Sequence, residues 1–303
     1  MTYLLYPLPG NEDLCEALAG HLNADVGHLE VHHFPDGETY VRAVTDPQDR
    51  PTILVATLAN PDTTFLPLVF AADALRDEGA KSVGYAAPYL AYMRQDKRFQ
   101  PGEAITSETF ARLLSGSLDW MVTVDPHLHR RSDLAEIYSI PATALHAAPH
   151  IGEWIKNNLS EVVLIGPDSE SAQWVEAVAK TAGAPSIVLE KIRRGDRDVS
   201  VSDPQAEQWK DRTPVLVDDI ISTARTMIET VKSLKEEGFR APICIGVHGI
   251  FADDAFNELS SAGAGEILTC NTIPHASNQI DLMPMIAAGI QDLNAQDLGA
   301  REL

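Results

Sequence analysis

Cysteine is scarce in this chain, basic residues are outnumbered and no long hydrophobic run occurs. The three cysteines, Cys15, Cys244 and Cys270, are widely spaced, so the sequence predicts neither a disulfide framework nor a zinc site, and we expect reduced core residues. Lys and Arg total 23 against 44 Asp and Glu, and this net charge of −21 argues against a nucleic-acid partner. Without a membrane-spanning run or a signal peptide, we expect no membrane association and a cytoplasmic location.

Short apolar stretches alternate with helix-like segments, which is the pattern of an α/β protein with parallel sheets. The predicted strands are Tyr3–Tyr6, Thr52–Thr57, Ser82–Ala87, Trp120–Val124, Glu161–Ile165, Ser186–Leu189, Pro214–Val217, Ile243–Val247 and Glu266–Cys270. The predicted helices are Thr64–Glu78, Ser107–Ser115, Ser169–Ala182, Thr226–Glu237 and Ile280–Asp292.

The chain of 303 residues is long enough for two domains, and polar loops follow predicted strands in both halves. We predict two similar domains, residues 1–146 and 147–279, with the C-terminal helix of residues 280–303 joining the first. No long Gly/Ser linker separates them, so we expect close packing with a site in the cleft.

The segment from Val215 to Thr226 is an apolar run that ends in two carboxylates and continues into hydroxyl residues. Asp218 and Asp219 can accept hydrogen bonds from the vicinal hydroxyls of a sugar at the carboxyl end of a parallel strand. Donors for a phosphate follow at the start of a helix, and this part of the segment is Ser222, Thr223, Ala224, Arg225 and Thr226. The alternative is an ordinary turn with a helix cap.

Two segments in the first half combine groups suited to a nucleotide. Phe34, Asp36 and Glu38 offer an aromatic face for a purine and carboxylates for its exocyclic amine, although a hairpin turn bracketed by a core Phe is the alternative. The residues Arg94, Gln95 and Asp96 begin a cation-rich loop that can bind polyphosphate, and the alternative is a solvated charged loop.

Three further positions suit metal binding or charge stabilisation. Asp125 and His127 follow a predicted strand and can join a magnesium site, and so can Asp168 after another strand, where a helix cap is the alternative. Lys191 and Arg193 follow a strand in a predicted loop, and both side chains point to the same side if that loop is extended.

Together these segments resemble the phosphoribosyl-diphosphate (PRPP) synthetases in order and over nearly the whole chain. Segment 215–226 resembles the PRPP-binding loop that these enzymes share with type I phosphoribosyltransferases, except that Arg225 stands where the family usually has glycine. The Arg-Gln-Asp sequence at residues 94–96 is close to diagnostic of the synthetases, and the following Lys-Arg-Phe is most like the archaeal-type branch.

The resemblance implies two domains of the type I phosphoribosyltransferase-like fold and a role for each motif. Phe34, Asp36 and Glu38 match the adenine loop, which in the family reaches a neighbouring subunit, so at least a homodimer is implied. Arg94–Asp96 would bind ATP, His127 would hold the Mg²⁺ carried with ATP, and Lys191 and Arg193 match the catalytic Lys-x-Arg loop.

The implied activity is transfer of diphosphate from MgATP to the 1-hydroxyl of ribose 5-phosphate, giving PRPP and AMP. A type I phosphoribosyltransferase is one alternative, but such enzymes lack the Arg-Gln-Asp loop. A catalytically silent, regulatory relative is another, because Arg225 and the changed residues 169–171 depart from the family pattern.

Overall fold

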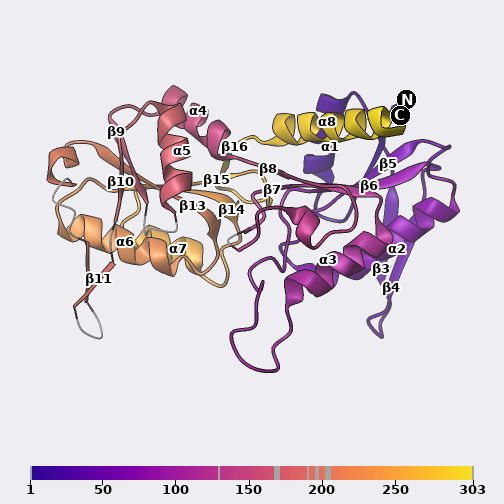
Figure 1. Ribbon diagram of the computed structural model, residues 1–303, viewed down its shortest axis with the longest axis horizontal. Coiled ribbons are helices and arrows are strands. Elements are labelled where there is room, and N and C mark those ends of the chain that lie inside the picture. The colour runs from indigo at the N-terminus through magenta and orange to yellow at the C-terminus, as the bar shows by residue number, and fades with distance from the viewer. Residues whose placement is uncertain are drawn as a thin grey trace. The chain divides into compact units, whose positions relative to one another are not determined.

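The computed structural model describes residues 2–128, 130–166, 171–189, 191–194, 198–201 and 206–301 (Figure 1). The chain divides into two compact units. Unit 1 comprises Met1–Leu145, Thr272–Pro274 and Leu282–Leu303, and unit 2 comprises His146–Asn271 and His275–Asp281. Across the described ranges, no helix has both the length and the apolar character needed to cross a bilayer.

A six-stranded parallel sheet lies at the centre of unit 1, in the order β2-β1-β5-β6-β7-β8. Its strands are β1 (Leu4–Pro7), β2 (Asp25–Val26), β5 (Pro51–Val55), β6 (Ser82–Ala87), β7 (Trp120–Val124) and β8 (Ala142–Leu145). The inner strands are nearly continuous apolar runs because both sheet faces are covered, and all five residues of β7 are buried.

Four helices cover this sheet: α1 (Glu12–Leu22), α2 (Pro61–Asp77), α3 (Thr106–Ser117) and α8 (Met283–Arg301), and a short 3-10 helix, η1, spans Leu134–Glu136. Helix α1 packs against α8 on one side of the sheet, and α2 packs against α3 on the other (Figure 1). Helix α2 begins three residues before the predicted Thr64, because Pro61 is preorganised for the first helical turn.

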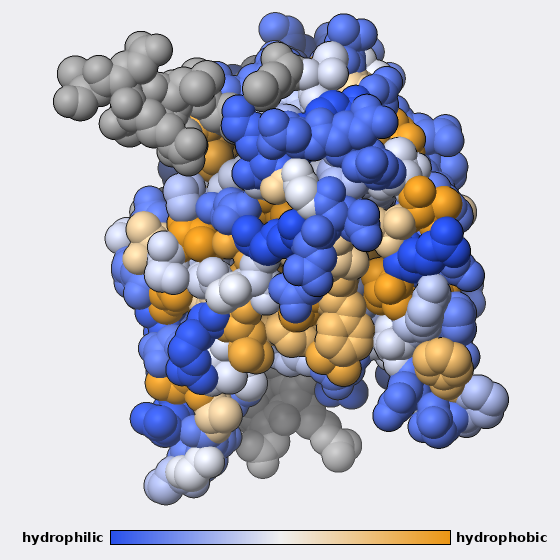
Figure 2. All heavy atoms as spheres, turned by 90° about the vertical axis from the view of Figure 1, so that its right-hand side faces the viewer, coloured by the Kyte–Doolittle hydropathy of each residue, from blue (hydrophilic) through white to orange (hydrophobic). Residues whose placement is uncertain are grey.

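An antiparallel hairpin, β3 (Leu29–His33) with β4 (Thr39–Ala43), extends from unit 1 and packs against α2 through β4. Several apolar side chains of this unit are exposed, among them Val26, Phe34, Val44, Leu66 and Phe70. The space-filling view shows such apolar surface separated by hydrophilic side chains on the face that it presents (Figure 2).

Unit 2 has its own six-stranded parallel sheet, in the order β10-β9-β13-β14-β15-β16. Its strands are β9 (Val162–Gly166), β10 (Ser186–Val188), β13 (Thr213–Ile221), β14 (Ile243–Gly249), β15 (Glu266–Cys270) and β16 (Asn278–Ile280). Its helices are α4 (Ala148–Asn158), α5 (Ala172–Ala182), α6 (Arg225–Glu236), α7 (Ala255–Ala262) and the 3-10 helix η2 (Ala206–Trp209). Helices α4 and α5 pack together, as do α6 and α7.

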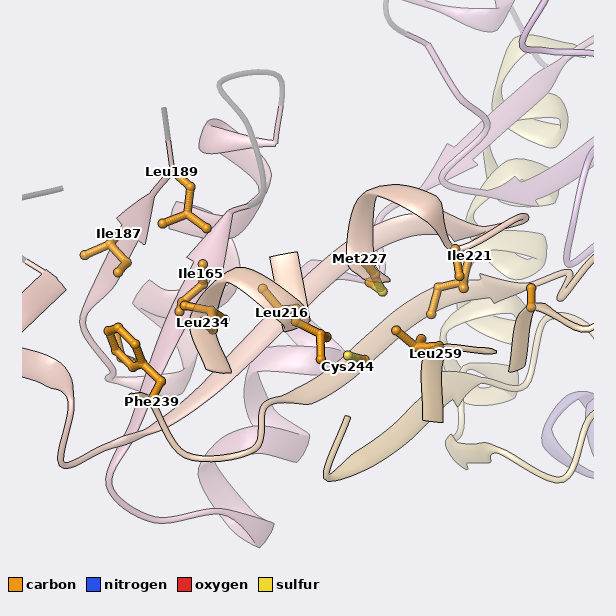
Figure 3. Packing of buried hydrophobic residues seen from close by; sticks show 14 residues of the cluster. Ile165, Ile187, Leu189, Leu216, Ile221, Met227, Leu234, Phe239, Cys244 and Leu259 are labelled. Carbon is orange, nitrogen blue, oxygen red and sulfur yellow. The ribbon is translucent and has the colours of Figure 1, made fainter. Parts of the chain in front are cut away.

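Segment 218–226 is anchored in the hydrophobic core that lies between α6, α7 and the sheet of unit 2. Ile221, Ala224 and Met227 belong to this core, together with Leu216 and Cys244 from the sheet (Figure 3). Buried side chains therefore pack the start of α6 against this core, whereas Thr223 and Arg225 are exposed to solvent.

The predicted α/β class with parallel sheets is confirmed, and three strands have the predicted bounds, Ser82–Ala87, Trp120–Val124 and Glu266–Cys270. The predicted loop at Lys191–Arg194 is wrong, since this segment is strand β11, paired antiparallel with β12 (Asp198–Val201). The β-branched residues Ile192, Val199 and Val201 favour such a ribbon despite the neighbouring charges.

The three cysteines are buried and form no disulfide, as expected. Burial raises the pKa of both Cys15 and Cys244 to about 12. Because the thiolate is the reactive form, neither side chain is a nucleophile at neutral pH.

Candidate active site

Strand β13 carries the two candidate ribose-binding carboxylates within its ladder. The prediction that the strand ends at Val217 is wrong, because β13 continues to Ile221 and pairs with β14 from Asp218↔Gly246 to Ile221↔Gly249. The apolar residues Ile220 and Ile221 extend the pairing beyond the carboxylates. Asp218 and Asp219 therefore stand on a rigid strand rather than in a turn.

Asp218 and Asp219 are both partly buried. The amide of Asp219 donates to Oδ1 of Asp218 at 3.0 Å, which draws that side chain back along the backbone. Carboxylate oxygens accept more than one hydrogen bond, so this contact leaves capacity for the hydroxyl groups of a ligand. Successive side chains of a strand point to opposite faces, and the two acids are therefore not equivalent.

The segment between β13 and α6 makes its turn at Ala224. Ala224 has a left-handed backbone with φ of 54°, is buried, and accepts the first helical hydrogen bond from Ile228 at 2.8 Å. The carbonyl of Ser222 accepts from the amide of Ala252 at 3.1 Å, which ties the turn to the segment after β14. The amides at the start of α6 therefore lie at the sheet edge, where they can bind an anion.

Helix α6 begins at Arg225, one residue before the predicted start at Thr226. The segment thus brings together the predicted residues Asp218, Asp219, Ser222, Thr223, Ala224, Arg225 and Thr226 at one strand–helix junction. The candidate ribose-phosphate residues of unit 2 share one short, anchored segment.

The candidate adenine residues lie at the tip of the β3–β4 hairpin. The amide of Phe34 donates to the carbonyl of Glu38 at 2.8 Å, and Gly37 takes the positive φ of 91° that the turn requires. A hairpin with Phe34 in the core was the alternative interpretation, and its second half is wrong, because Phe34 is 44% exposed. The ring centre of His32 lies 5.1 Å from that of Phe34 and 4.5 Å from that of Tyr40, on which it stacks. The three rings form an aromatic cluster at the tip.

Residues 94–96 follow β6 at the carboxyl edge of the sheet of unit 1. Arg94 is exposed, whereas Gln95 is anchored through its carbonyl, which accepts from the amide of Ser107 at 3.3 Å. The Asp96 carboxylate is nearly buried and accepts from Arg130 Nη1 at 2.8 Å. The structure therefore joins the Arg94–Asp96 loop to the segment after β7.

Asp125 and His127 follow β7 and are both partly buried. Asp125 has φ of 34°, and its amide donates to the carbonyl of Leu145 at 2.9 Å, so the chain turns sharply at the strand end. Among the residues that the structure describes, no three His, Cys, Asp or Glu side chains form a metal cage. Asp125 and His127 thus offer one carboxylate and one imidazole at the same strand end.

The remaining predicted positions are Asp168, Lys191 and Arg193. Asp168 lies outside the described residues. For Lys191 and Arg193 the backbone is strand β11, in register with Val201 and Val199 of β12, and not the predicted loop.

Two residues on or beside the candidate site were not predicted. Arg130 is one, although it ends the segment that contains Asp125 and His127. His275 is another: it follows β15 and packs against Phe251 at 4.6 Å, and the amide of Phe251 donates to Ile221. Both residues follow a parallel strand, and ligand-binding residues are usually found beyond the carboxyl ends of such strands. This position in the sequence could have indicated them.

Comparison with known proteins defines the class. The family model for the N-terminal domain of ribose phosphate pyrophosphokinase matches residues 3–117, and the phosphoribosyl transferase domain model matches residues 133–283. A solved structure of phosphoribosylpyrophosphate synthetase from Mycobacterium smegmatis has a TM-score of 0.84 and 23% identity, covering 98% of this chain and 100% of that one. The predicted fold, with two parallel-sheet domains of the type I phosphoribosyltransferase-like kind, is confirmed.

Curated relatives extend the match along the sequence. Ribose-phosphate pyrophosphokinase 2 of Archaeoglobus fulgidus is 34% identical over 286 residues, which is 94% of this chain and 99% of that protein. The ribose-phosphate pyrophosphokinase of Methanopyrus kandleri is 31% identical over 280 residues, 91% of this chain and 94% of that protein. This chain belongs to the ribose-phosphate pyrophosphokinase family, and the predicted likeness to archaeal members is confirmed.

Proposed function

We propose that this protein is a ribose-phosphate pyrophosphokinase, which transfers diphosphate from ATP to the 1-hydroxyl of ribose 5-phosphate and releases AMP. The observation that carries the proposal is the anchored Arg94–Asp96 loop, with Asp96 paired to Arg130. A phosphoribosyltransferase also needs a ribose-phosphate segment like 218–226 but has no use for a polyphosphate-binding loop in a second domain. The two segments together support synthesis of PRPP over its consumption.

On this proposal the residues act by positioning and by charge. Asp218 and Asp219 accept hydrogen bonds from the ribose hydroxyls, and the start of α6 with Thr223 and Thr226 holds the 5-phosphate. The anomeric oxygen then attacks the β-phosphorus of ATP, and a new P–O bond forms. The bond from the β-phosphorus to the bridging oxygen breaks, AMP leaves with that oxygen, and the proton of the 1-hydroxyl is released to solvent. The reaction requires in-line placement and neutralised charge, and no covalent enzyme intermediate.

Cationic side chains stabilise the oxygens that gain charge during this transfer. We assign this role to Arg94, Lys191 and Arg193, because guanidinium and ammonium groups stabilise developing phosphoryl charge most where water is excluded. The net charge of −21 makes such local cations necessary for binding a polyanion.

We further propose that Mg²⁺ enters with ATP. Asp125 and His127 at the end of β7, together with Asp168, would hold it, and such an ion would neutralise the phosphate oxygens. Mg²⁺ usually binds through one or two protein side chains plus substrate phosphates, which fits a strand end that has two donors and no cage within the described residues.

Product analysis tests the function. Purified protein is incubated with ribose 5-phosphate, ATP and Mg²⁺, and AMP and PRPP are measured together; we expect equal amounts of the two. ATP binding without either product would support a regulatory relative instead. Formation of a nucleotide from PRPP and a nucleobase would support a phosphoribosyltransferase.

The Lys191→Ala variant tests the assigned chemistry within the same assay. We expect a fall in kcat of about 100-fold or more with little change in KM, because the lysine would act mainly in the transition state. Lys210→Ala is the control, since Lys210 pairs with Glu207 at 2.6 Å on an exposed surface. Full turnover in Lys191→Ala would refute the catalytic role.

We also propose that the protein is at least a homodimer. The exposed aromatic tip around Phe34 suits insertion next to another copy, and Leu66 and Phe70 add exposed apolar surface on α2. Light scattering at micromolar concentration should give at least twice the chain mass of 32.9 kDa. A mass equal to that of one chain would contradict the proposal.

A further inference from the structure

Tyr92 adopts a backbone conformation that tyrosine rarely takes, two residues before Arg94. Its φ is 61°, in the left-handed region. Such a residue costs free energy and persists only where its surroundings hold it, and these positions cluster at functional sites. Met93 is buried and Arg94 is exposed, so the turn at Tyr92 sets the direction in which Arg94 leaves the protein.

The side chain of Tyr92 is held by two helices. Its hydroxyl donates a hydrogen bond to Oδ1 of Asp62, in the first turn of α2. Its ring lies 4.8 Å from the ring of Phe110, which is buried in α3. The hydrogen bond to Asp62 raises the pKa of Tyr92, because it stabilises the protonated hydroxyl that donates it.

A cavity of about 330 Å³ borders the Tyr92 ring, and Phe65, Thr106 and Leu113 are among its other lining residues. The ring is therefore not enclosed by close packing, which would otherwise fix a side chain in one position. Its placement depends on the Phe110 contact and on the hydrogen bond to Asp62.

The chain is also anchored on the other side of Arg94. The carbonyl of Gln95 accepts from the amide of Ser107 at 3.3 Å, and Asp96 is paired with Arg130 at 2.8 Å. Arg94 thus stands between two anchors, and the anchor at Tyr92 consists of the Phe110 contact and one side-chain hydrogen bond.

We infer that Tyr92, held by Asp62 and Phe110, is a positioning residue that fixes the backbone so that Arg94 meets the phosphates of ATP. The inference rests on the proposed function, in which Arg94 binds ATP. Tyr92 itself need not touch the nucleotide. If its hydroxyl is removed, other backbone conformations at residue 92 become populated, and the fraction of chains that present Arg94 correctly falls.

A set of matched variants tests this inference through the dissociation constant for MgATP, measured by calorimetry without ribose 5-phosphate. Tyr92→Phe and Asp62→Ala each remove the hydrogen bond, and we expect either to weaken binding by about two- to tenfold. Asp62→Asn removes the negative charge, as Asp62→Ala does, but keeps an acceptor oxygen for the Tyr92 hydroxyl. The affinity of this variant for MgATP should therefore stay within about twofold of the wild type. The contrast between Asn and Ala isolates the hydrogen bond from the charge.

A double-mutant cycle with Arg94→Gln separates positioning from a general structural effect. If Tyr92 acts through Arg94, Tyr92→Phe should change the affinity of the Arg94→Gln protein by less than about twofold. An equal loss in both backgrounds would overturn the inference, as would unchanged affinity in Tyr92→Phe and Asp62→Ala. If the wild type makes PRPP and these variants bind ATP normally, this inference alone is overturned. If the wild type itself binds no ATP, the proposed function is overturned as well.

Discussion

Arg130 Nη1 lies 2.8 Å from Oδ1 of Asp96, and the Asp96 side chain is only 5% exposed whereas that of Arg130 is 49% exposed. The two residues are 34 positions apart and follow neighbouring parallel strands, β6 and β7. Arg130 also lies over the ring of Phe99, with its guanidinium carbon 5.8 Å from the ring centre. This one side chain therefore holds the Arg94–Asp96 loop to the segment that contains Asp125 and His127.

Replacing Arg130 with Gln should destabilise the protein. The change leaves the nearly buried Asp96 carboxylate without its charged partner, so the free energy of unfolding should fall by about 1–3 kcal/mol. Arg42→Gln is the control, because Arg42 and Glu30 are 3.5 Å apart and both largely exposed. Its effect should be about 0.5 kcal/mol or less. Urea denaturation at pH 7 measures both, and equal losses would contradict the argument.

Two Gly→Ala changes should have opposite effects on stability. A Cβ at Gly84 in β6 would overlap the indole ring of Trp120, which is buried in β7, so Gly84→Ala should cost about 1–3 kcal/mol. Gly20 lies inside α1 and faces open space, so Gly20→Ala should add about 0.5–1 kcal/mol by lowering the entropy lost on helix formation. Thermal denaturation gives both signs. A stable Gly84→Ala protein would mean that the Trp120 ring moves at little cost.

The strands β6 and β7 were predictable because both faces of a central parallel strand are buried, which leaves a nearly continuous apolar run in the sequence. The end of β13 was not predictable, because the length of this strand is set by backbone pairing with β14, and carboxylate side chains do not stop that pairing. Likewise, the charges around Lys191 suggested a loop, whereas the ladder with β12 depends on residues farther along the chain.

Candidate residues could be located from the sequence where an apolar run leads into a motif, as at Asp218 and Asp219 near the carboxyl end of β13. The contacts that hold the candidate residues in place could not be predicted in this way. The contact between Tyr92 and Asp62 joins residues 30 positions apart, and the left-handed backbone at Tyr92 has no glycine to indicate it. Such contacts follow from the packing of α2 and α3, which is a property of the folded unit.

Acidification should remove stability through His275. Nδ1 of His275 accepts from the amide of Ser277 at 3.1 Å, and the ring packs against Phe251 and Phe256. Burial lowers the pKa of His275, so below about pH 6.5 the unfolded chain binds a proton that the folded protein resists. Stability is therefore lost as the pH falls through this region and is retained above it.

The difference in unfolding free energy between the wild type and His275→Gln isolates this effect from other titrating groups. We expect the advantage of the wild type to shrink between pH 7.5 and pH 5.5. His28→Gln, which removes an exposed histidine, provides the comparison. A difference that stays constant with pH would contradict the assigned role of burial.

Arg225 stands where the family usually has glycine, yet the backbone does not require glycine there. The left-handed residue of the turn is Ala224, whereas Arg225 is the exposed first residue of α6. The remaining question is whether the side chain obstructs the 5-phosphate or binds it. A guanidinium at the start of a helix adds a charged donor to amides that already favour anions, so we expect it to bind.

Arg225→Ala should therefore weaken ribose 5-phosphate binding by about tenfold or more, the usual effect of losing a charge-assisted hydrogen bond, and leave ATP binding unchanged. Lys232→Ala makes the same charge change at an exposed position of α6 and should alter neither affinity. Arg225→Gly opens the backbone as well. If that variant binds ribose 5-phosphate more tightly than the wild type, the arginine obstructs the site. If it loses affinity as Arg225→Ala does, this chain has replaced the close approach that glycine allows with a charged ligand of its own.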